Sequence, residues 1–501
     1  MRGSVLVCGT HSDAGKSVVV AGLCRWLARE GVRVAPFKAQ NMALNSFVTR
    51  EGAEIGRAQA AQAAAARVEP EAAMNPVLLK PSSGGSTQVV VLGKPRAVAS
   101  ARGYQRMKPR LLPVVLEALW DLRRRFDAVV CEGAGSPAEI NLRENDLANM
   151  GLARAAGLPV VLVGDIDRGG LFASLYGTLA LLSPGDRALV RGFIVNKFRG
   201  DPAVLAPGLA ELSRRTGRPF LGTLPYAPGV GLDGEDSLAL REAGVGAAGG
   251  EVLRVAVVRL GRMSNFTDFD PLLCEPRVAL RFTRSAAEVL AADLAIVPGT
   301  KATVEDLGGL REAGIDGALA ARALRGLPTL GICGGYQMLG RRISDGVEGE
   351  VPEAEGLGLL PVETVFEPEK VLARPAGVAP GFGGVEVCGY EIHHGRTTRL
   401  GGEPLFVGEG LEEGCRVGTV LGTSWHGVLE CDGFRRALLR WVAEVCGLRG
   451  WEPGDFSFPA VREERLDRLG DLVAENLDRE VLLRILEEAG EKEEAGVPYP
   501  S

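Results

Sequence analysis

Short apolar runs alternate along the chain with longer stretches in which apolar residues recur at helical spacing. Four runs in the first half are rich in β-formers and are not interrupted by polar residues: 5–8, 128–131, 160–163 and 193–195. Such strands are buried on both faces, as in parallel sheets that are covered by helices. The pattern therefore predicts an α/β fold with a doubly wound parallel sheet.

The same alternation begins again at Leu253 and runs to about Val445, which predicts a second α/β domain. Between the two series, EAGVGAAGG (242–250) has four glycines in nine positions and little apolar mass, a composition typical of a linker. We therefore predict four parts of the chain: a first domain at 1–241, a linker at 242–251, a second domain at 252–449 and a tail at 450–501.

The tail is acidic and carries leucines and valines at helical spacing between Leu466 and Leu477. This spacing predicts one amphipathic helix. The segment that follows, EEAGEKEEAG at 487–496, is strongly charged, and we expect it to be solvated.

Composition narrows the class of protein. The 501 residues suffice for two domains of roughly 200 residues, each with its own core. With 57 basic and 63 acidic residues the net charge is −6, and no dense basic stretch is present, so we expect no nucleic-acid partner. The N-terminus runs directly into a strand, and no apolar run approaches the roughly 18 residues of a membrane span. We therefore expect a cytoplasmic protein without a membrane partner.

The nine cysteines form no CxxC pair and no regular framework, which favours reduced thiols over disulfides or structural zinc. The sequence leaves open whether the protein forms a homo-oligomer.

A phosphate-binding loop is predicted at 9–17, GTHSDAGKS, between the first strand and a helix that ends near Gly31. In such a loop backbone N–H groups, here including those of Thr10 and Gly15, surround the phosphates, Lys16 neutralises them and Ser17 binds magnesium. Strict spacing would put the first glycine at position 10, whereas Gly9 lies one residue earlier. The alternative is a glycine-rich turn with a chance GKS, but its place between strand and helix favours nucleotide binding.

Two further strand ends carry candidate ligands of the nucleotide. Glu132 ends the strand at 128–131, where parallel sheets bind ligands, and we predict that it directs magnesium. The alternative is a glutamate that caps the following turn. Asn196 and Lys197 end another strand and are candidates for contacts with the base. Arg199 occupies the position where the guanine-specific NKxD motif needs an acid, which favours ATP over GTP.

A candidate nucleophile, Cys333, follows the apolar run 328–332 and precedes GGYQMLG, so it lies on a tight turn at the start of a helix. His426 is the candidate base, and the alternative is a buried histidine bonded to a backbone carbonyl. For His393 the structural role is favoured. Backbone N–H groups of Gly334 and of the turn at Gly299 are candidate oxyanion donors.

The two sites together suggest an enzyme that activates one substrate and takes ammonia from another, as glutamine-dependent synthetases do. Long sequence runs carry a more specific resemblance: APFKAQNMALNSFVTREGAEIGRAQAAQA (35–63), MNPVLLKP (74–81), EGAGSPAEINL (132–142), GDIDRGG (164–170), NKFRGD (196–201), RMSNFTDFDPL (262–272) and GICGGYQMLG (331–340). With these runs the chain resembles the cobyric acid synthase family, the corrinoid amidotransferases of cobalamin biosynthesis, over nearly its whole length.

The resemblance implies an ATP- and Mg²⁺-dependent ligase with an N-terminal domain similar to dethiobiotin synthetase and a C-terminal class I, triad-type glutamine amidotransferase domain. Its substrates would be glutamine and adenosylcobyrinic acid a,c-diamide, amidated at the b, d, e and g carboxylates. It further implies that Lys38 contacts the transferred phosphate and that Glu54 is another metal ligand. The polar run Gln40, Asn41, Asn45 and Ser46 would face the corrinoid or solvent.

One position departs from the better-known class I triad, which has a glutamate two residues after the histidine. Here Val428 occupies that position and Glu430 lies four residues on, so the group that orients His426 stays unidentified. A Cys-His dyad would be compatible with the corrinoid branch.

Three alternatives remain open at this point. The first is a partitioning-type ATPase whose second domain binds partners, although Cys333 and His426 count against it. The second is the sister ligase, a cobyrinic acid a,c-diamide synthase, whose motifs after the phosphate loop differ. The third is an amide ligase for a peptidoglycan precursor, which usually divides the two domains between separate chains.

Overall fold

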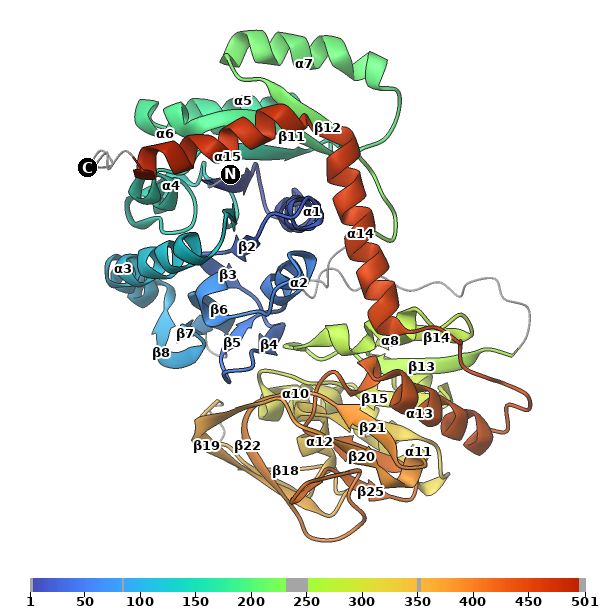
Figure 1. Cartoon of the computed structure of the whole chain (residues 1–501). Helices are drawn as coiled ribbons and strands as arrows, with labels where there is room; N and C mark the ends of the chain where they lie inside the picture. The colour runs from blue at the N-terminus through green and yellow to red at the C-terminus, as the bar shows by residue number, and fades with distance from the viewer. Residues whose placement is uncertain (1–2, 83–84, 231–250, 349–352, 495–501) are drawn as a thin grey trace.

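The computed structural model describes residues 3–82, 85–230, 251–348 and 353–494; the side chains of 489–494 are not included. The described residues form two α/β domains that lie against each other, with the N-terminal domain above the C-terminal one in Figure 1. The linker predicted at 242–251 lies outside the described residues except for Glu251. Within these ranges, no helix has the length and apolar character needed to cross a membrane.

The N-terminal domain is built on a six-stranded sheet in the order β12-β11-β10-β1-β9-β2, with every neighbouring pair parallel. All four strands predicted in this half lie in the sheet. Its strands are β1 (Gly3–Gly9), β2 (Val34–Phe37), β9 (Ala128–Glu132), β10 (Val160–Asp165), β11 (Val190–Phe198) and β12 (Phe220–Pro225).

Helices cover both faces of this sheet, which explains why its strands are uninterrupted apolar runs. Along β1, Val5 and Val7 join one core and Leu6 and Cys8 join the core on the other face, because successive side chains point to opposite faces. The helices of the domain are α1 (Lys16–Arg29), α2 (Arg57–Ala65), α3 (Ala101–Arg125), α4 (Met150–Ala156), α5 (Leu171–Leu181), α6 (Pro184–Leu189) and α7 (Pro202–Thr216).

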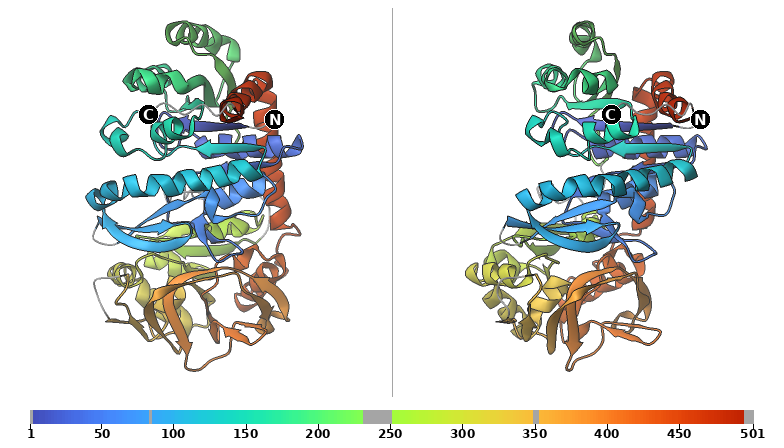
Figure 2. Two further views of the ribbon diagram at one scale, coloured as in Figure 1. Left: turned by 60° about the vertical axis from the view of Figure 1, so that its left-hand side comes forward. Right: turned by 90° about the vertical axis from the view of Figure 1, so that its left-hand side faces the viewer.

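A smaller sheet and a hairpin, which the sequence pattern did not predict, extend the N-terminal domain toward the C-terminal one. The sheet has the order β3-β6-β7-β8, the hairpin pairs β4 with β5, and α3 lies beside β8 (Figure 2). Their bounds are β3 (Gln40–Met42), β4 (Ser46–Val48), β5 (Glu54–Gly56), β6 (Val77–Pro81), β7 (Ser86–Val91) and β8 (Lys94–Ser100). These short strands hold the segment between α1 and α2 next to the domain interface.

The C-terminal domain has a second six-stranded sheet, in the order β14-β13-β15-β16-β26-β25, which is parallel except for β25. Its strands are β13 (Leu253–Val258), β14 (Val278–Thr283), β15 (Leu294–Val297), β16 (Thr329–Ile332), β25 (Cys415–Val417) and β26 (Val420–Thr423). Its helices are α8 (Asp270–Leu273), α9 (Ala286–Ala291), α10 (Thr303–Glu312), α11 (Ile315–Leu324), α12 (Gly334–Leu339) and α13 (Asp432–Val445). The predicted doubly wound sheet of the N-terminal domain and the predicted α/β fold of the C-terminal domain are thus confirmed.

Two four-stranded sheets complete this domain, in the orders β18-β17-β19-β22 and β21-β20-β23-β24. Their strands are β17 (Arg342–Ser344), β18 (Glu353–Glu355), β19 (Val362–Ala373), β20 (Ala376–Ala379), β21 (Val385–Cys388), β22 (Glu391–Arg399), β23 (Phe406–Gly408) and β24 (Leu411–Glu413). Within the first, β19 and β22 form the longest antiparallel pair of the domain.

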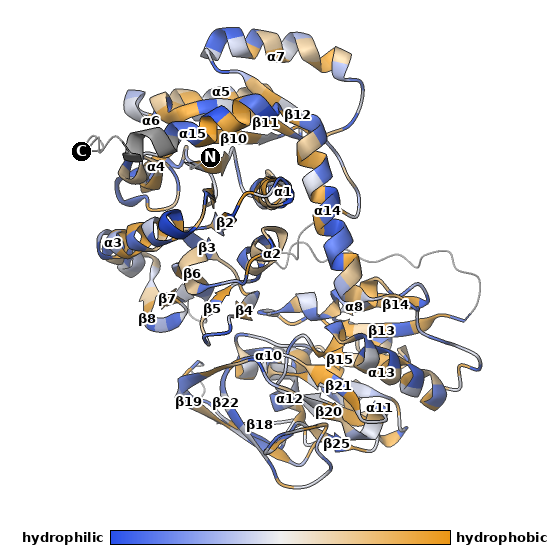
Figure 3. Cartoon of the chain, viewed as in Figure 1, coloured by the Kyte–Doolittle hydropathy of each residue, from blue (hydrophilic) through white to orange (hydrophobic). Residues whose placement is uncertain are grey.

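The tail forms two helices, α14 (Phe458–Asn476) and α15 (Arg479–Glu494), where one was predicted. α14 runs along one side of the molecule from the C-terminal to the N-terminal domain (Figure 1), and its colouring mixes hydrophilic and hydrophobic residues (Figure 3). It packs tightly on α1, since a Cβ at Gly22 would lie 2.4 Å from Val473 Cγ2. Of the segment expected to be solvated, 487–494 continue α15. The tail therefore returns the chain to the first domain.

Candidate active site

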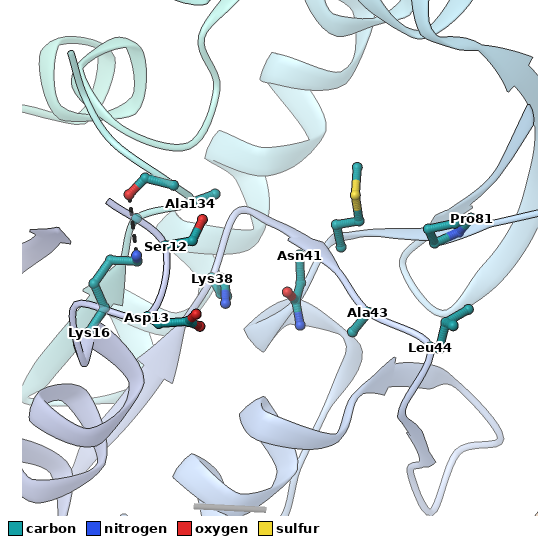
Figure 4. Close-up of a pocket in the computed structure, with 12 residues that line it drawn as sticks. Ser12, Asp13, Lys16, Lys38, Asn41, Ala43, Leu44, Pro81 and Ala134 are labelled. Atoms are coloured by element: carbon teal, nitrogen blue, oxygen red, sulfur yellow. Dashed lines mark hydrogen bonds between the residues drawn. The ribbon is translucent and has the colours of Figure 1, made fainter. Parts of the chain in front are cut away.

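The phosphate loop leaves β1 at Gly9 and enters α1 at Lys16, as predicted. Gly15 has φ +97°, and a Cβ there would lie 1.9 Å from Asn196 Nδ2, so only glycine fits. Lys16 Nζ donates hydrogen bonds to the carbonyl oxygens of His11 (3.1 Å) and Gly135 (3.2 Å), the second of which is drawn in Figure 4. The ammonium group is thus held at the mouth of the loop.

Glu132, the last residue of β9, is fully buried beside the loop and is surrounded by donors. Ser17 Oγ donates to its Oε1 at 2.8 Å, Lys38 Nζ lies 2.9 Å from the same oxygen, and Gln62 Nε2 donates to Oε2 at 2.5 Å. Burial by itself would raise the pKa of Glu132, but the positive charge and hydrogen bond of Lys38 outweigh it and lower the pKa. The structure therefore brings Ser17, Lys38 and Glu132 together.

A pocket of about 380 Å³ opens on this cluster. Lys16, Lys38 and Asp13 line one side of it, and Asn41 and Leu44 line the other, as Figure 4 shows. The pocket joins the phosphate loop to the polar run that starts at Gln40. A phosphate chain and the group that receives it could therefore meet here.

Asn196 and Lys197 hold the phosphate loop through hydrogen bonds to its backbone carbonyl oxygens. Asn196 Nδ2 donates to the Ala14 carbonyl at 2.9 Å, while Lys197 Nζ contacts the Asp13 carbonyl and Asp165 Oδ2, both at 2.7 Å. These contacts favour a positioning role for both residues over the expected contact with the base.

Glu54 does not join the cluster around Glu132. Both of its oxygens are paired at 2.6 Å, Oε1 with Lys80 and Oε2 with Lys370 of the C-terminal domain. Burial opposes ionisation, yet the two lysines hold the pKa of Glu54 far below its usual range. The structure thus argues against our expectation that Glu54 binds magnesium, because its carboxylate is already neutralised as part of a buried ion cluster between the domains.

This assignment predicts that Glu54→Gln destabilises the protein and leaves its magnesium requirement unchanged. Removing one partner of a buried pair costs about 3–5 kcal/mol, since Lys80 and Lys370 would lose their counter-charge. Thermal unfolding should show a lower Tm than for the wild type and for Glu51→Gln, an exposed neighbour in the same hairpin. An unchanged Tm together with a higher magnesium requirement would restore the metal role.

Cys333 lies on a sharp turn between β16 and α12. Its φ of 50° and ψ of −110° are rare for a residue with a side chain, as at the nucleophile of a strand-turn-helix elbow. Gly334 and Gly335 make this turn fit, because a Cβ at Gly335 would lie 1.9 Å from the Val297 carbonyl oxygen. Cys333 is 5% exposed and is therefore buried.

His426 faces this cysteine, and a residue that the sequence did not reveal orients its ring. Asp268, in the turn η5 (Phe266–Phe269), accepts a hydrogen bond from His426 Nδ1 at 2.7 Å and one from the backbone N–H of Gly427 at 2.8 Å. The ring of Tyr390 stacks on the imidazole with 5.4 Å between centroids. The orienting group is thus an aspartate 158 positions before the histidine, and Glu430 binds Arg57 and Arg462 instead.

The charges around His426 favour its protonated form. Burial alone would lower its pKa, but the Asp268 carboxylate and the Cys333 thiolate, both next to the ring, raise the pKa of His426 to about 10. An imidazolium beside the sulfur stabilises the thiolate, which is the nucleophilic form of cysteine. Cys333, His426 and Asp268 therefore form a triad suited to acyl transfer.

Asp268→Asn is expected to reduce glutamine hydrolysis on the order of 10³-fold, because the ring would lose its orientation and tautomer control. The alkaline limb of kcat/KM should also move to lower pH, since an imidazolium without its carboxylate loses its proton more readily. A glutaminase pH profile measures both effects, with Asp270→Asn as the control from the same segment. An unchanged alkaline limb would contradict the role of Asp268.

The predicted oxyanion donors lie against the same triad. A Cβ on Gly299 would lie 2.6 Å from His426 Cε1, and a Cβ on Gly334 would lie 2.8 Å from Thr300 Cγ2. The turn 298–300 therefore contacts the histidine through Gly299 and the elbow through Thr300, so its backbone N–H groups remain candidate donors for a developing oxyanion.

The other histidines have structural contacts. His393 Nδ1 lies 2.7 Å from the Gly395 carbonyl oxygen, in line with the structural role that we favoured. His394, for which the sequence offered no role, lies 3.4 Å from Gln88 Nε2 of the N-terminal domain. It thus belongs to the domain interface.

Direct hydrogen bonds across this interface join the segment beside the phosphate pocket to the turn that carries Asp268. Asn45 Oδ1 accepts from the Phe266 N–H at 3.2 Å, and Asn265 Oδ1 accepts from the Ser46 N–H at 2.8 Å. Phe266 and Asn265 lie two and three positions before Asp268 in the sequence. Part of the polar run thought to face a substrate or solvent instead contacts the turn that carries the triad aspartate.

Comparisons with known proteins match the chain to two family models, one in each domain. Residues 5–238 match the family model of the CobQ/CobB/MinD/ParA nucleotide binding domain, and residues 254–434 match the CobB/CobQ-like glutamine amidotransferase domain. The cobyric acid synthase of Streptomyces avermitilis is 56% identical, covering 100% of this chain and 99% of its own. That of Streptomyces coelicolor is 57% identical with the same coverage. A crystal structure of a glutamine amidotransferase is 26% identical over 38% of this chain and 98% of its own, with a TM-score of 0.31.

Proposed function

Since the chain belongs to the cobyric acid synthase family, with relatives more than half identical over its full length, we propose that it uses ATP and glutamine to amidate the b, d, e and g carboxylates of adenosylcobyrinic acid a,c-diamide. Its family makes it a glutamine amidotransferase enzyme of cobalamin biosynthesis with a nucleotide-binding domain. The carboxylates, the use of ATP and the residue roles below are our proposal.

The observation that carries this proposal is the pairing of two complete sites in one molecule. A Cys-His-Asp triad on an elbow suits release of ammonia, and a lysine-rich phosphate site with a buried glutamate suits activation of an acid. The hydrogen bonds of Asn45 and Ser46 join the segment next to the phosphate pocket to the turn of Asp268. A switch ATPase would need only the phosphate site, so the presence of the triad favours the ligase.

In the glutaminase half, the Cys333 thiolate attacks the carboxamide carbon of glutamine, and the oxyanion that forms is held by backbone donors near Gly299 and Gly334. The C–N bond then breaks, and the His426 imidazolium gives its proton to the departing ammonia. Water, activated by the now neutral ring, hydrolyses the thioester to glutamate and restores the thiolate. Asp268 keeps the ring aimed at the sulfur throughout.

In the synthetase half, a corrinoid carboxylate attacks the terminal phosphate of ATP, ADP leaves, and ammonia displaces phosphate from the acyl phosphate. Lys16 and Lys38 balance the charge of the phosphates being transferred. The hydroxyl of Ser17 and the carboxylate of Glu132 lie 2.8 Å apart and would hold Mg²⁺, because this ion prefers oxygen ligands. When bound, the ion would withdraw charge from the phosphate oxygens.

The pocket wall opposite the phosphate loop suits the acceptor. Asn41 offers an amide, while Met42, whose side chain is 54% exposed, and Leu44 offer apolar surface. A corrin ring carries apolar faces and a rim of carboxylates and amides, so such a mixed wall matches its chemistry. We infer that an acid side chain of the corrin enters here.

The direct test is to incubate the protein with ATP, magnesium, glutamine and the corrinoid diamide and to follow the corrinoid by mass spectrometry. Successive replacement of carboxylate by carboxamide, ending at cobyric acid, is expected. If the diamide is not amidated but cobyrinic acid, supplied in its place, is amidated at only the a and c positions, the protein is the sister ligase. ATP hydrolysis without amidation of either corrinoid would identify a switch.

A further inference from the structure

Two cysteines outside the triad lie within reach of each other. Cys388 ends β21, and Cys431 follows the turn η7 (Val428–Glu430) at the start of α13. Their sulfur atoms are 3.3 Å apart, and the backbone N–H of Cys388 donates to the Cys431 sulfur at 3.2 Å. Cys388 is exposed and Cys431 is half-buried, so solvent reagents can reach the pair.

The environment of this pair favours reaction. The hydrogen bond shared with Cys431 and the charge of Arg374 lower the pKa of Cys388, against the effect of its partial burial. Burial has the opposite effect on other thiols and raises the pKa of Cys415 to about 11. Cys388 therefore forms a thiolate more readily than an ordinary cysteine, and a second sulfur that can resolve a mixed disulfide lies 3.3 Å away.

The residues beside both cysteines hold the catalytic histidine and the domain interface. Tyr390, two positions after Cys388, exchanges backbone hydrogen bonds with His426 (3.0 and 2.9 Å). Glu430, directly before Cys431, pairs with Arg57 of the N-terminal domain at 2.5 Å. A shift of Cys388 would therefore move Tyr390 and with it the catalytic histidine. A shift of Cys431 would move Glu430 and with it the ion pair at the domain interface.

An arginine-rich groove of about 800 Å³ lies near the pair. Arg57, Arg67, Arg374 and Arg462 line it, and Arg374 is the arginine whose charge acts on Cys388. Glu69 and Glu463 also line the groove, and Glu430 pairs with Arg57 and Arg462, so four arginines stand against three acids. A small disulfide that carries carboxylates therefore meets a modest excess of positive charge.

We propose that Cys388 and Cys431 form a redox-active pair that a small anionic disulfide closes into an intramolecular disulfide, which slows the glutaminase reaction. The Cys388 thiolate attacks one sulfur of the reagent and releases its first thiolate. Cys431 gives its proton to solvent, attacks the Cys388 sulfur and releases the second thiolate. The two protein thiols are oxidised, and the reagent is reduced to two thiols.

Closure has a geometric consequence. A disulfide bond is about 2.05 Å long, so the sulfur atoms must approach by about 1 Å from their present separation. A displacement of this size next to a catalytic group can cost up to roughly 10²-fold in rate, and we expect a glutaminase loss of about tenfold. This loss rests on the proposed function, whereas formation of the disulfide does not.

The first experiment treats the full-length protein with oxidised glutathione and maps disulfides by mass spectrometry without reduction. A peptide pair joined through Cys388 and Cys431 is expected in the wild type and in Cys446→Ser, and it should be absent from Cys388→Ser and Cys431→Ser. Glutathione that remains on Cys388 without that bond, or no reaction at either cysteine, would overturn the proposal.

The second experiment measures glutaminase and ammonium-dependent amidation before and after oxidation. Only the glutaminase should fall, it should recover with dithiothreitol, and Cys388→Ser should be resistant. An equal loss in Cys388→Ser would assign the inhibition to another thiol and overturn the regulatory role. If the reduced wild type hydrolyses no glutamine, the proposed function fails, and the disulfide map still decides on the pair.

Discussion

Cys333→Ala is expected to abolish glutamine-dependent amidation, by on the order of 10⁴-fold or more, because no other group at the elbow can form the thioester. Amidation with ammonium salts should persist at a rate close to that of the wild type, since the phosphate site lies in the other domain. Both rates can be measured in one corrinoid assay with the nitrogen source as the variable.

The matched control for this variant is Cys446→Ala, a half-buried thiol of the same domain. It should keep both activities. If Cys333→Ala loses the ammonium-dependent reaction as well while its Tm is unchanged, the two half-reactions do not reside in separate sites as described.

Glu132→Gln is expected to impair amidation and to leave glutamine hydrolysis intact. Amidation should fall by roughly 10²-fold or more with either nitrogen source, because a preorganised charge at the phosphate site is lost. Hydrolysis of glutamine should continue, since the triad of Cys333, His426 and Asp268 is untouched. The measurements are corrinoid amidation with each nitrogen source and release of glutamate.

Burial of Glu132 makes a folding control necessary for this variant. Glutamine keeps the size of the side chain and can still accept from Ser17, but Lys38 loses its buried counter-charge, so a lower Tm is expected than for Glu117→Gln on the exposed side of α3. The activities are therefore compared at a temperature where the variant is folded. Retained amidation in a folded Glu132→Gln protein would contradict the assignment of this residue to the phosphate site.

Much of the fold was readable from the sequence, because the parallel strands are fully buried. Runs such as 160–163 contain no polar residue, so the amino-acid sequence alone predicts that these strands are buried on both faces. The short antiparallel strands were missed. β8, for example, alternates exposed and half-buried residues without a strong apolar face, and its place depends on pairing with β7 rather than on local pattern.

The residues of the candidate site also fall into two groups, those that local sequence motifs predicted and those that they did not. Lys16, Ser17, Glu132 and Cys333 are marked by local motifs at strand ends, and the structure brings the first three together with Lys38. Asp268 could not be found by spacing, since it reaches His426 only through the folded chain.

Glu54 is a residue to which local sequence reasoning gave a role that the structure argues against. Nothing near it in the sequence announces that Lys370, more than three hundred residues away, neutralises it. Roles that are set by contacts between domains therefore escape local reasoning, whereas roles that are set by strand-to-helix turns do not.

The most direct test of the account follows nitrogen. Glutamine carrying heavy nitrogen in its side-chain amide is supplied with ATP, magnesium and the corrinoid diamide, and the product is analysed by mass spectrometry together with glutamate and ADP. The account predicts heavy nitrogen in every new corrinoid amide, with one glutamate and one ADP formed for each. Corrinoid amides without the label, or glutamate formed with no amidation, would contradict transfer of ammonia from the Cys333 site to the Glu132 site.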